Sequence, residues 1–172
     1  GADDTDGDGI PDTVEDGSGT CLSSTDDDSD DDGILDGNED LNRNGVWDEA
    51  EGETNFCDAD TDDDLILDGT EIGLTAPQGS DTDLGVFVAD ADGGTTTNPL
   101  NPDTDGDGVD DGVEDANQNG AVDPGETDPL AGPGDPAISN LALSSTSGSN
   151  FSTDVLTCGY DLAGTATTAA TA

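Results

Sequence analysis

The sequence predicts a mostly irregular fold of tandem acidic loops with little regular secondary structure, followed by a C-terminal all-β segment. One pattern of twelve residues occurs six times within residues 4–126. The 172-residue chain carries 44 acidic residues against one basic residue, a formal charge of −43, and only 29% of it is hydrophobic. After residue 131 Ser, Thr and Ala dominate. These observations predict loops over residues 1–131, a Gly- and Pro-rich linker over 132–136 and a β-strand segment over 137–172.

The repeated pattern is D-x-[DN]-x-[DN]-x-x-x-D-x-x-E, which places oxygen-bearing side chains at positions 1, 3, 5, 9 and 12 of each loop. Ca²⁺ takes about six to eight oxygen ligands, and a twelve-residue loop supplies them from these positions and from the carbonyl of position 7. We therefore predict loops wrapped around at least six Ca²⁺ ions. The predicted ligands are Asp4, Asp6, Asp8, Ile10, Asp12 and Glu15 in loop one; Asp28, Asp30, Asp32, Ile34, Asp36 and Glu39 in loop two; Asp40, Asn42, Asn44, Val46, Asp48 and Glu51 in loop three; Asp60, Asp62, Asp64, Ile66, Asp68 and Glu71 in loop four; Asp103, Asp105, Asp107, Val109, Asp111 and Glu114 in loop five; and Asp115, Asn117, Asn119, Ala121, Asp123 and Glu126 in loop six.

Positions 6 and 7 of the pattern are also regular. Position 6 must turn sharply and is Gly in five loops, but it is Leu65 in loop four, so the geometry of that loop is an open question. Position 7 is apolar in all six loops, although calcium needs only its carbonyl. We expect these six side chains to pack against neighbouring loops as a small apolar core.

The charge of the chain excludes several classes of function. Like charges repel one another and oppose compaction, so we expect the chain to fold only when cations bind, and metal binding then supplies the folding free energy. A solvated acidic tail would not keep Gly and an apolar residue in phase with the acids. With a single Arg and no Lys the chain cannot bind nucleic acid through phosphate contacts, and we expect no direct membrane insertion. We also expect no enzymatic activity, because the chain has no His and no nucleophile beside a base.

The spacing of the loops distinguishes them from EF-hands. Glu39 is followed at once by Asp40, and Glu114 at once by Asp115, so no helix fits between these paired loops. Between loops four and five, residues 79–99 contain four acids in broken phase, which either hold another ion or hold none. Those acids are Asp81, Asp83, Asp90 and Asp92. In the same stretch Val86–Val88 is predicted as a short strand.

The chain contains three cysteines. Cys21 and Cys57 flank loops two and three symmetrically, which makes them the expected disulfide. Cys158 is then left over: it is either a buried thiol or pairs with a cysteine outside this sequence or on another chain.

The loop region resembles thrombospondin type 3 repeats of the bacterial type. The resemblance rests on the runs DTDGDGVDDGVE at residues 103–114 and DTDGDGIPD at 4–12, and on the spacer TNPLNP at 97–102. It covers residues 3–130, and Leu65 departs from it. The resemblance implies a backbone wound around bound Ca²⁺, disulfides between neighbouring repeats, and a structural or adhesive role.

The C-terminal segment is similar to the first strands of an immunoglobulin-like sandwich. Residues 137–144 and 153–162 are expected strands, and apolar residues alternate along the second one. Two strands cannot bury a core alone, so the missing strands must come from elsewhere. Strands exchanged between subunits would give self-association into a fibre through β-strand contacts.

The sequence therefore favours a calcium-stabilised structural segment of an extracellular or cell-surface protein, such as the repeating subunit of a fibre or stalk. Extracellular calcium modules bind weakly, with dissociation constants of about 10⁻⁴–10⁻³ M, and fill only outside cells. One alternative is a calcium-dependent adhesion module, for which Trp47 is the candidate contact residue unless it serves packing. A second alternative is a flexible polyanionic calcium buffer, which would bind ions without folding.

Overall fold

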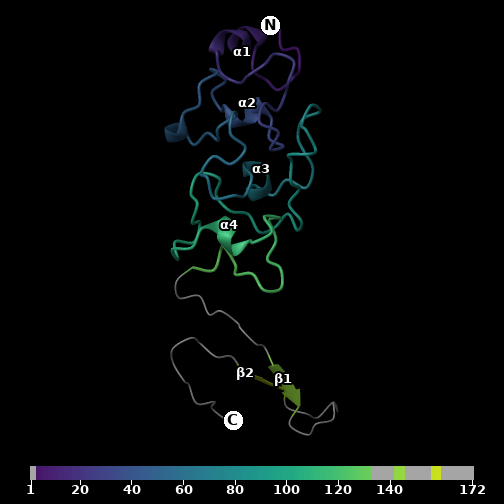
Figure 1. The fold of residues 1–172 in the computed structure, drawn as a ribbon, viewed down its shortest axis with the longest axis vertical. Helices are drawn as coiled ribbons and strands as arrows, with labels where there is room; N and C mark the ends of the chain where they lie inside the picture. Colours follow the sequence, from purple (N-terminus) through teal and green to yellow (C-terminus); the bar gives the residue numbers. More distant parts are fainter. Residues whose placement is uncertain (1–2, 133–141, 146–155, 160–172) are drawn as a thin grey trace. The chain divides into compact units, whose positions relative to one another are not determined.

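The computed structural model describes residues 3–132 and the backbone of residues 142–145 and 156–159. The chain divides into two units, Gly1–Gly132 and Pro133–Ala172. The prediction of a mostly irregular fold is confirmed for residues 3–132, whose regular elements are all short. They are α1 (Asp12–Ser18), α2 (Asp36–Glu39), a 3₁₀ helix η1 (Glu49–Glu51), α3 (Asp68–Glu71) and α4 (Asp111–Glu114) (Figure 1).

The four α-helices occupy the same place in four of the loops. Each begins at position 9, directly after an extended residue at position 8 whose ψ lies between 138° and 144°. An acidic residue in the first turn interacts favourably with the positive end of the helix dipole. Helices α2, α3 and α4 are single turns, too short to be stable alone, so the rest of each loop must hold them in place.

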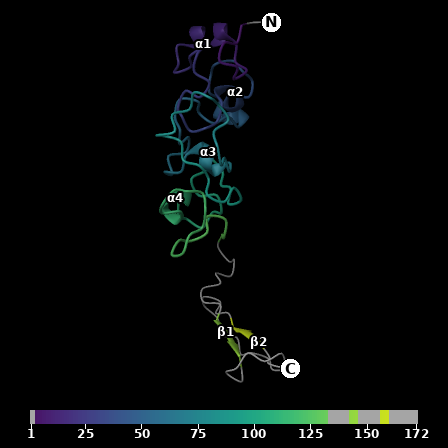
Figure 2. The same ribbon diagram turned by 90° about the vertical axis from the view of Figure 1, so that its right-hand side faces the viewer.

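Loops one, two, four and five follow one another along one axis, and we call this arrangement the stack (Figures 1 and 2). Loops three and six lie beside it. A Cβ atom added to Gly45 of loop three would lie 2.8 Å from Val14 of α1, and one added to Gly120 of loop six would lie 3.1 Å from Thr70 of α3. The side loops therefore pack against the helices of the stack.

The apolar core is small and divided among the loops. Ile10, Leu22 and Phe56 form one buried cluster, and Ile34 and Ile66 are buried separately. The prediction that position 7 is buried is thus confirmed in loops one, two and four. Ala121 of loop six is half-buried.

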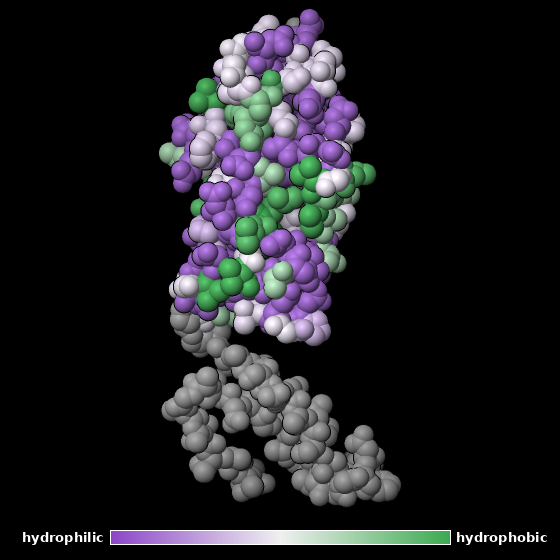
Figure 3. All heavy atoms as spheres, in the orientation of Figure 1, coloured by the Kyte–Doolittle hydropathy of each residue, from purple (hydrophilic) through white to green (hydrophobic). Residues whose placement is uncertain are grey.

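At two position-7 residues the same prediction is wrong. Val46 is 60% exposed and Val109 is 39% exposed. Within the stack, position 7 is covered by the helix of the following loop, as Gly37 covers Ile10. Val46 lies in a side loop and Val109 in the last loop of the stack, so neither has such a cover. Figure 3 shows one face of the molecule, on which apolar patches alternate with hydrophilic ones.

Residues 76–92 cross back along the stack. The backbone N–H of Gln78 donates to the carbonyl of Gly33 at 2.9 Å, and the N–H of Asp83 donates to Oδ1 of Asp31 at 2.6 Å. Farther along, the hydroxyl of Thr70 donates to the carbonyl of Val88 at 2.6 Å. The crossing segment thereby ties loop two to loop four.

The expected strand at Val86–Val88 is wrong. The N–H groups of Val86 and Phe87 both donate to the carbonyl of Asp83, at 2.8 and 3.1 Å, which makes a turn. The turn places the Phe87 ring over Gly33, where an added Cβ would lie 2.5 Å from the ring.

The predicted disulfide between Cys21 and Cys57 is present, and it closes a loop of 36 residues that contains loops two and three. In the second unit, β1 (Ala142–Ser145) pairs antiparallel with β2 (Leu156–Gly159), with Leu143 opposite Cys158. The remaining residues of the two expected strands, and of the linker beyond Gly132, lie outside the described residues. The immunoglobulin-like arrangement therefore stays a prediction. Within the described part of the chain, no helix is long and apolar enough to cross a membrane.

Candidate metal centres

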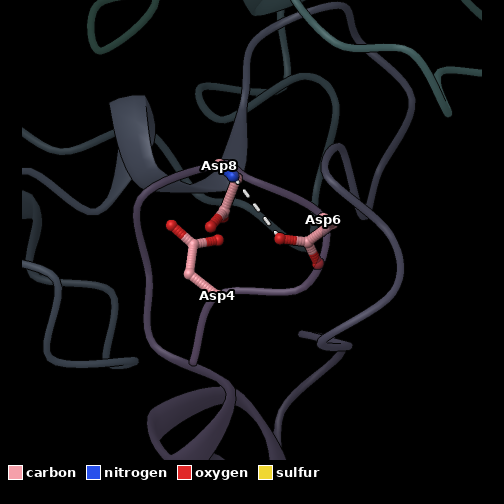
Figure 4. A group of neighbouring side chains, drawn as sticks. All are labelled: Asp4, Asp6 and Asp8. Carbon is pink, nitrogen blue, oxygen red and sulfur yellow. Dashed lines mark hydrogen bonds between the residues drawn. The ribbon is translucent and has the colours of Figure 1, made fainter. Parts of the chain in front are cut away.

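Positions 1, 3 and 5 of a loop form a compact acidic cluster. In loop one the carboxylates of Asp4, Asp6 and Asp8 converge on the interior of the turn, and the N–H of Asp8 donates to Oδ1 of Asp6 at 3.4 Å (Figure 4). Each residue offers an oxygen, and these oxygens lie within 4.8 Å of one another. The same grouping recurs in two further loops, as Asp28, Asp30 and Asp32 and as Asp60, Asp62 and Asp64.

Short-range hydrogen bonds hold these carboxylates in place. Position 1 accepts from the N–H of position 6, as in Asp28 Oδ2 with Gly33 at 3.1 Å. Position 5 accepts from the N–H of position 7, as in Asp32 Oδ1 with Ile34 at 2.7 Å. Each bond uses one oxygen of a carboxylate and leaves the other oxygen for a different partner. The loop itself therefore orients the cluster.

Loop four keeps this geometry despite its Leu at position 6. Leu65 has a φ of +96°, equal to that of Gly108 at the same position of loop five. Its N–H donates to Oδ2 of Asp60 at 2.9 Å, as the N–H of Gly108 does to Asp103. This φ is strained for a residue with a Cβ atom. The Leu65 side chain is 58% exposed, so it avoids a clash by pointing into solvent.

A second type of cluster joins successive loops of the stack. Asp32 and Glu39, at positions 5 and 12 of loop two, lie with Asp68, at position 9 of loop four. The same positions recur one step farther along, as Asp64, Glu71 and Asp111. All members of both clusters are buried. Sequence reasoning assigned positions 9 and 12 to the ion of their own loop, whereas the structure places position 9 against the preceding loop.

The position-9 carboxylate also receives hydrogen bonds within its own loop. Oδ1 of Asp68 accepts from the N–H of Thr61 at 2.8 Å, and Oδ2 accepts from its hydroxyl at 2.6 Å. The backbone N–H of position 2 makes this contact in every loop of the stack, and its hydroxyl does so in loops one, two and four. The donors are Thr5, Ser29, Thr61 and Thr104. Sequence reasoning missed this position, although Thr or Ser there separates the stack loops from the side loops, which carry Leu41 and Ala116.

A glycine at position 10 allows the loops to approach each other. The N–H of Gly69 donates to Oδ2 of Asp32 at 2.9 Å, and that of Gly112 donates to Oδ2 of Asp64 at 3.1 Å. A Cβ atom on either glycine would lie closer than 3.0 Å to the backbone carbonyl oxygen of the same Asp. The contact therefore requires glycine, even though glycine disfavours helix by about 1 kcal/mol.

Buried carboxylate oxygens without hydrogen-bond partners recur through the stack. In each of the four loops of the stack, at least one carboxylate oxygen at position 3 and one at position 12 are buried and accept no hydrogen bond from the described residues. An unpaired buried charge is strongly destabilising, so such groups normally pair or bind metal. The residues concerned are Asp6, Asp30, Asp62 and Asp105 at position 3 and Glu15, Glu39, Glu71 and Glu114 at position 12.

The raised pKa values of the buried carboxyls in the stack also indicate that these groups need a bound cation. Burial, with the charge of Asp30 adding to it, raises the pKa of Asp32 to about 8. Burial likewise raises the pKa of Asp30 to about 7 and that of Glu71 to about 10. At neutral pH their ionised forms are therefore disfavoured, and a bound cation that compensates the charge favours loss of the proton. With oxygen as the only donor, the clusters suit a hard cation such as Ca²⁺ better than zinc or copper.

Loop three is built differently. Asp40 is fully buried, but Asp48 and Glu51 are exposed. A residue that sequence reasoning did not select, Glu53, is fully buried instead. Its Oε1 accepts from the side-chain amide of Asn42 at 3.0 Å, and its Oε2 accepts from the N–H of Asp48 at 2.9 Å. Hydrogen bonds donated by Asn42 and Asp48 of loop three thus satisfy the buried carboxylate of Glu53.

Loop six and the crossing segment each contribute a buried acid. In loop six Asp115 is buried with Oδ1 unpartnered, whereas Asp123 is exposed. Asp81, Asp83 and Asp92 of the crossing segment are also exposed. Of the four acids predicted there, Asp90 alone is buried, and its Oδ2 has no partner. The four do not converge on one site.

Comparison of the chain with models of protein families, with curated proteins and with solved structures finds no match in any of the three.

Proposed function

We propose that this chain is a calcium-stabilised structural segment of an extracellular protein. The observation that carries the proposal is the recurrence of buried, unpartnered carboxylate oxygens at positions 3 and 12 of every loop in the stack. Their repulsion opposes folding until cations bind, and bound cations then join one loop to the next. Calcium would act as the folding agent, and the folded stack as a spacer.

Two properties favour calcium outside cells. Seven or so oxygen ligands from a flexible loop suit Ca²⁺ better than Mg²⁺, which demands a small octahedral shell and keeps its waters. The Cys21–Cys57 disulfide fits an oxidising compartment, where calcium is also abundant. The resemblance of residues 3–130 to thrombospondin type 3 repeats supports the same proposal.

A structural role is favoured over an adhesive one by the environment of Trp47. Its ring N–H donates to the backbone carbonyl of Glu53 at 3.0 Å, and the residue is 39% exposed. Trp47 therefore packs as part of loop three. Assembly into a fibre through exchanged β-strands would add a polymeric function to this spacer, and it is part of the proposal.

The test is the hydrodynamic radius of the full chain during a calcium titration, with reversal by chelator and magnesium as the comparison ion. We expect reversible, cooperative contraction in Ca²⁺ and a much weaker response to Mg²⁺. Two variants at position 12 provide a matched pair: Glu39→Gln, in a cluster between loops, and Glu51→Gln, on the surface. Glu39→Gln should shift the midpoint to at least several-fold higher calcium, and Glu51→Gln should not.

Two results of this experiment would contradict the proposal. A chain that binds ions but stays expanded would be a calcium buffer, and the structural proposal would be wrong. Equal shifts for Glu39→Gln and Glu51→Gln would mean that the clusters between loops do not control folding.

A further inference from the structure

The two ends of the stack differ, and the difference follows from how each loop covers the one before it. Position 7 is 0% exposed in Ile10, 4% in Ile34 and 2% in Ile66, but 39% in Val109. The exposure of position 5 changes in the same way between loops four and five, because Asp64 is buried whereas Asp107 is exposed. Among the described residues, Asp107 and Val109 of loop five therefore stay exposed where each earlier loop of the stack is buried against its successor.

At each step of the stack the following loop carries the same two residue types at positions 9 and 10. Each successor brings a Gly at position 10, which lies against a backbone carbonyl, and an Asp at position 9. In loops four and five this Asp joins the acidic cluster of the preceding loop. The Asp-Gly pairs are Asp36-Gly37, Asp68-Gly69 and Asp111-Gly112. A Cβ at any of the three glycines would lie closer than 3.0 Å to that carbonyl oxygen. The cover therefore consists of a calcium loop with Asp-Gly at positions 9 and 10.

Loop one cannot serve as such a cover. Its position 9 is Asp12, but its position 10 is Thr13, which has a branched side chain where the contact admits only glycine. Thr13 is exposed. Loop one therefore cannot dock on the exposed face of loop five in a second copy of the chain.

The open face carries half of a metal cluster. Glu114 is only 5% exposed, and its Oε2 has no hydrogen-bond partner among the described residues. Asp107 and Glu114 correspond to Asp64 and Glu71, whose cluster is completed by Asp111 of the next loop. After Gly112 the sequence contains no further Asp-Gly pair. Residues 113–172 therefore supply no Asp-Gly pair to complete this half-site.

We propose that the open face of loop five, formed by the exposed Asp107 and Val109 next to the buried carboxylate of Glu114, docks a calcium loop of another polypeptide that carries Asp at position 9 and Gly at position 10. The incoming Asp would share a Ca²⁺ with Asp107 and Glu114. Both surfaces are acidic, so docking depends on that cation. The inference rests on the proposed calcium function.

The test supplies a docking loop from the chain itself. Thr13→Gly gives loop one the missing Asp-Gly pair, and Val109→Lys in the same molecule blocks its own open face. This donor is mixed with the wild-type chain in millimolar Ca²⁺ and followed by sedimentation velocity. We expect a species of about twice the mass of either chain, as for a one-to-one pair, which disappears in chelator.

Three controls make the result specific. A donor with Thr13→Ala in place of Thr13→Gly should not pair, because Ala keeps the Cβ atom. Adding Asp12→Asn to the glycine donor should weaken pairing at least tenfold. Wild-type chain that carries Val109→Lys should not accept the donor.

Several outcomes would overturn the inference. No pairing by the glycine donor, with both chains contracted by Ca²⁺, would show that the open face takes no such loop while leaving the proposed function intact. Equal pairing by the alanine donor would show that the contact does not depend on glycine. Chains that fail to contract in Ca²⁺ would overturn the proposed function and this inference together.

Discussion

Gly69 donates its backbone N–H to Oδ2 of Asp32 at 2.9 Å, across 37 residues of sequence. Asp32 uses its other oxygen within its own loop, where Oδ1 accepts from Ile34. One carboxylate thus shapes its loop and joins it to the next. Gly112 makes the same bond to Asp64. This bond therefore sets the spacing between loops two and four and between loops four and five.

Gly69→Ala should separate loops two and four. The added Cβ would lie closer than 3.0 Å to the carbonyl oxygen of Asp32, and the backbone must shift. We expect a loss of about 2 kcal/mol in the free energy of unfolding in Ca²⁺, measured by urea denaturation. The control is Gly17→Ala in α1, where no atom lies within 4 Å of an added Cβ. That change should stabilise the chain by up to about 1 kcal/mol. Equal effects at the two sites would contradict the proposed spacing contact.

Leu65→Gly should stabilise loop four. Leu65 holds a φ of +96°, which glycine adopts without strain, and its exposed side chain contributes little burial. Relief of strain outweighs the greater freedom of glycine in the unfolded chain, for a net gain of about 1 kcal/mol. Thermal unfolding in Ca²⁺ measures it.

The reciprocal change, Gly108→Leu, tests the same reasoning in loop five, where φ is also +96° and no atom lies within 4 Å of an added Cβ. It should destabilise by a similar amount. Gly33→Leu should be far worse, because Phe87 occupies the space. A neutral Gly108→Leu would refute the strain argument.

Stability should depend on pH in opposite directions with and without calcium. Burial raises the folded-state pKa of Asp30 to about 7 and those of Asp32 and Glu15 to about 8, whereas unfolded carboxyls titrate near about 4. The calcium-free folded chain binds protons more tightly than the unfolded chain. Its stability should therefore be highest near pH 4 and fall as the pH rises towards about 8.

With Ca²⁺ present the sign reverses, because protons compete with the cation for the same oxygens. Calcium affinity should fall steadily as the pH is lowered from about 8 to about 5. Hydrodynamic radius against pH, in chelator and in Ca²⁺, measures both trends. Parallel curves in the two conditions would contradict burial of these carboxyls.

Reduction of the Cys21–Cys57 disulfide should destabilise loops two and three. The bond closes a loop of 36 residues, for which chain entropy predicts about 4 kcal/mol. The measurement is urea unfolding of Cys21→Ser and of its parent in Ca²⁺, both with Cys158→Ser to prevent thiol exchange. A difference below about 1 kcal/mol would mean that bound cations already constrain the unfolded chain.

Glu53 should matter more to loop three than Glu51. Glu53→Ala removes a buried carboxylate that accepts from Asn42 and from the N–H of Asp48, so we expect a loss of about 2 kcal/mol. Glu51→Ala, on the surface, should change stability by less than about 0.5 kcal/mol. Trp47, the sole tryptophan, reports on this loop by fluorescence during denaturation. A larger effect of Glu51→Ala would restore the original assignment of position 12.

Features that depend only on residues close together in the sequence could be predicted before the structure was known. Carboxylates at alternate positions gather because the turn that gathers them lies within five residues, as Asp4, Asp6 and Asp8 do. The irregular fold follows from the Gly-rich pattern, in which the helix that begins at position 9 is a single turn in loops two, four and five and seven residues long in loop one. The disulfide was also predictable, because two of the three cysteines flank one pair of loops symmetrically.

The tertiary structure alone decided which loops stack and what each carboxylate faces. Asp68 lies with Asp32 and Glu39 through contacts between residues far apart in sequence, and a local pattern of ligands does not specify such contacts. All six loops carry the pattern, yet only those with Thr or Ser at position 2 entered the stack. Val46 and Val109 are exposed for the same reason: whether position 7 is buried depends on which loop follows in space, and not on the residue itself.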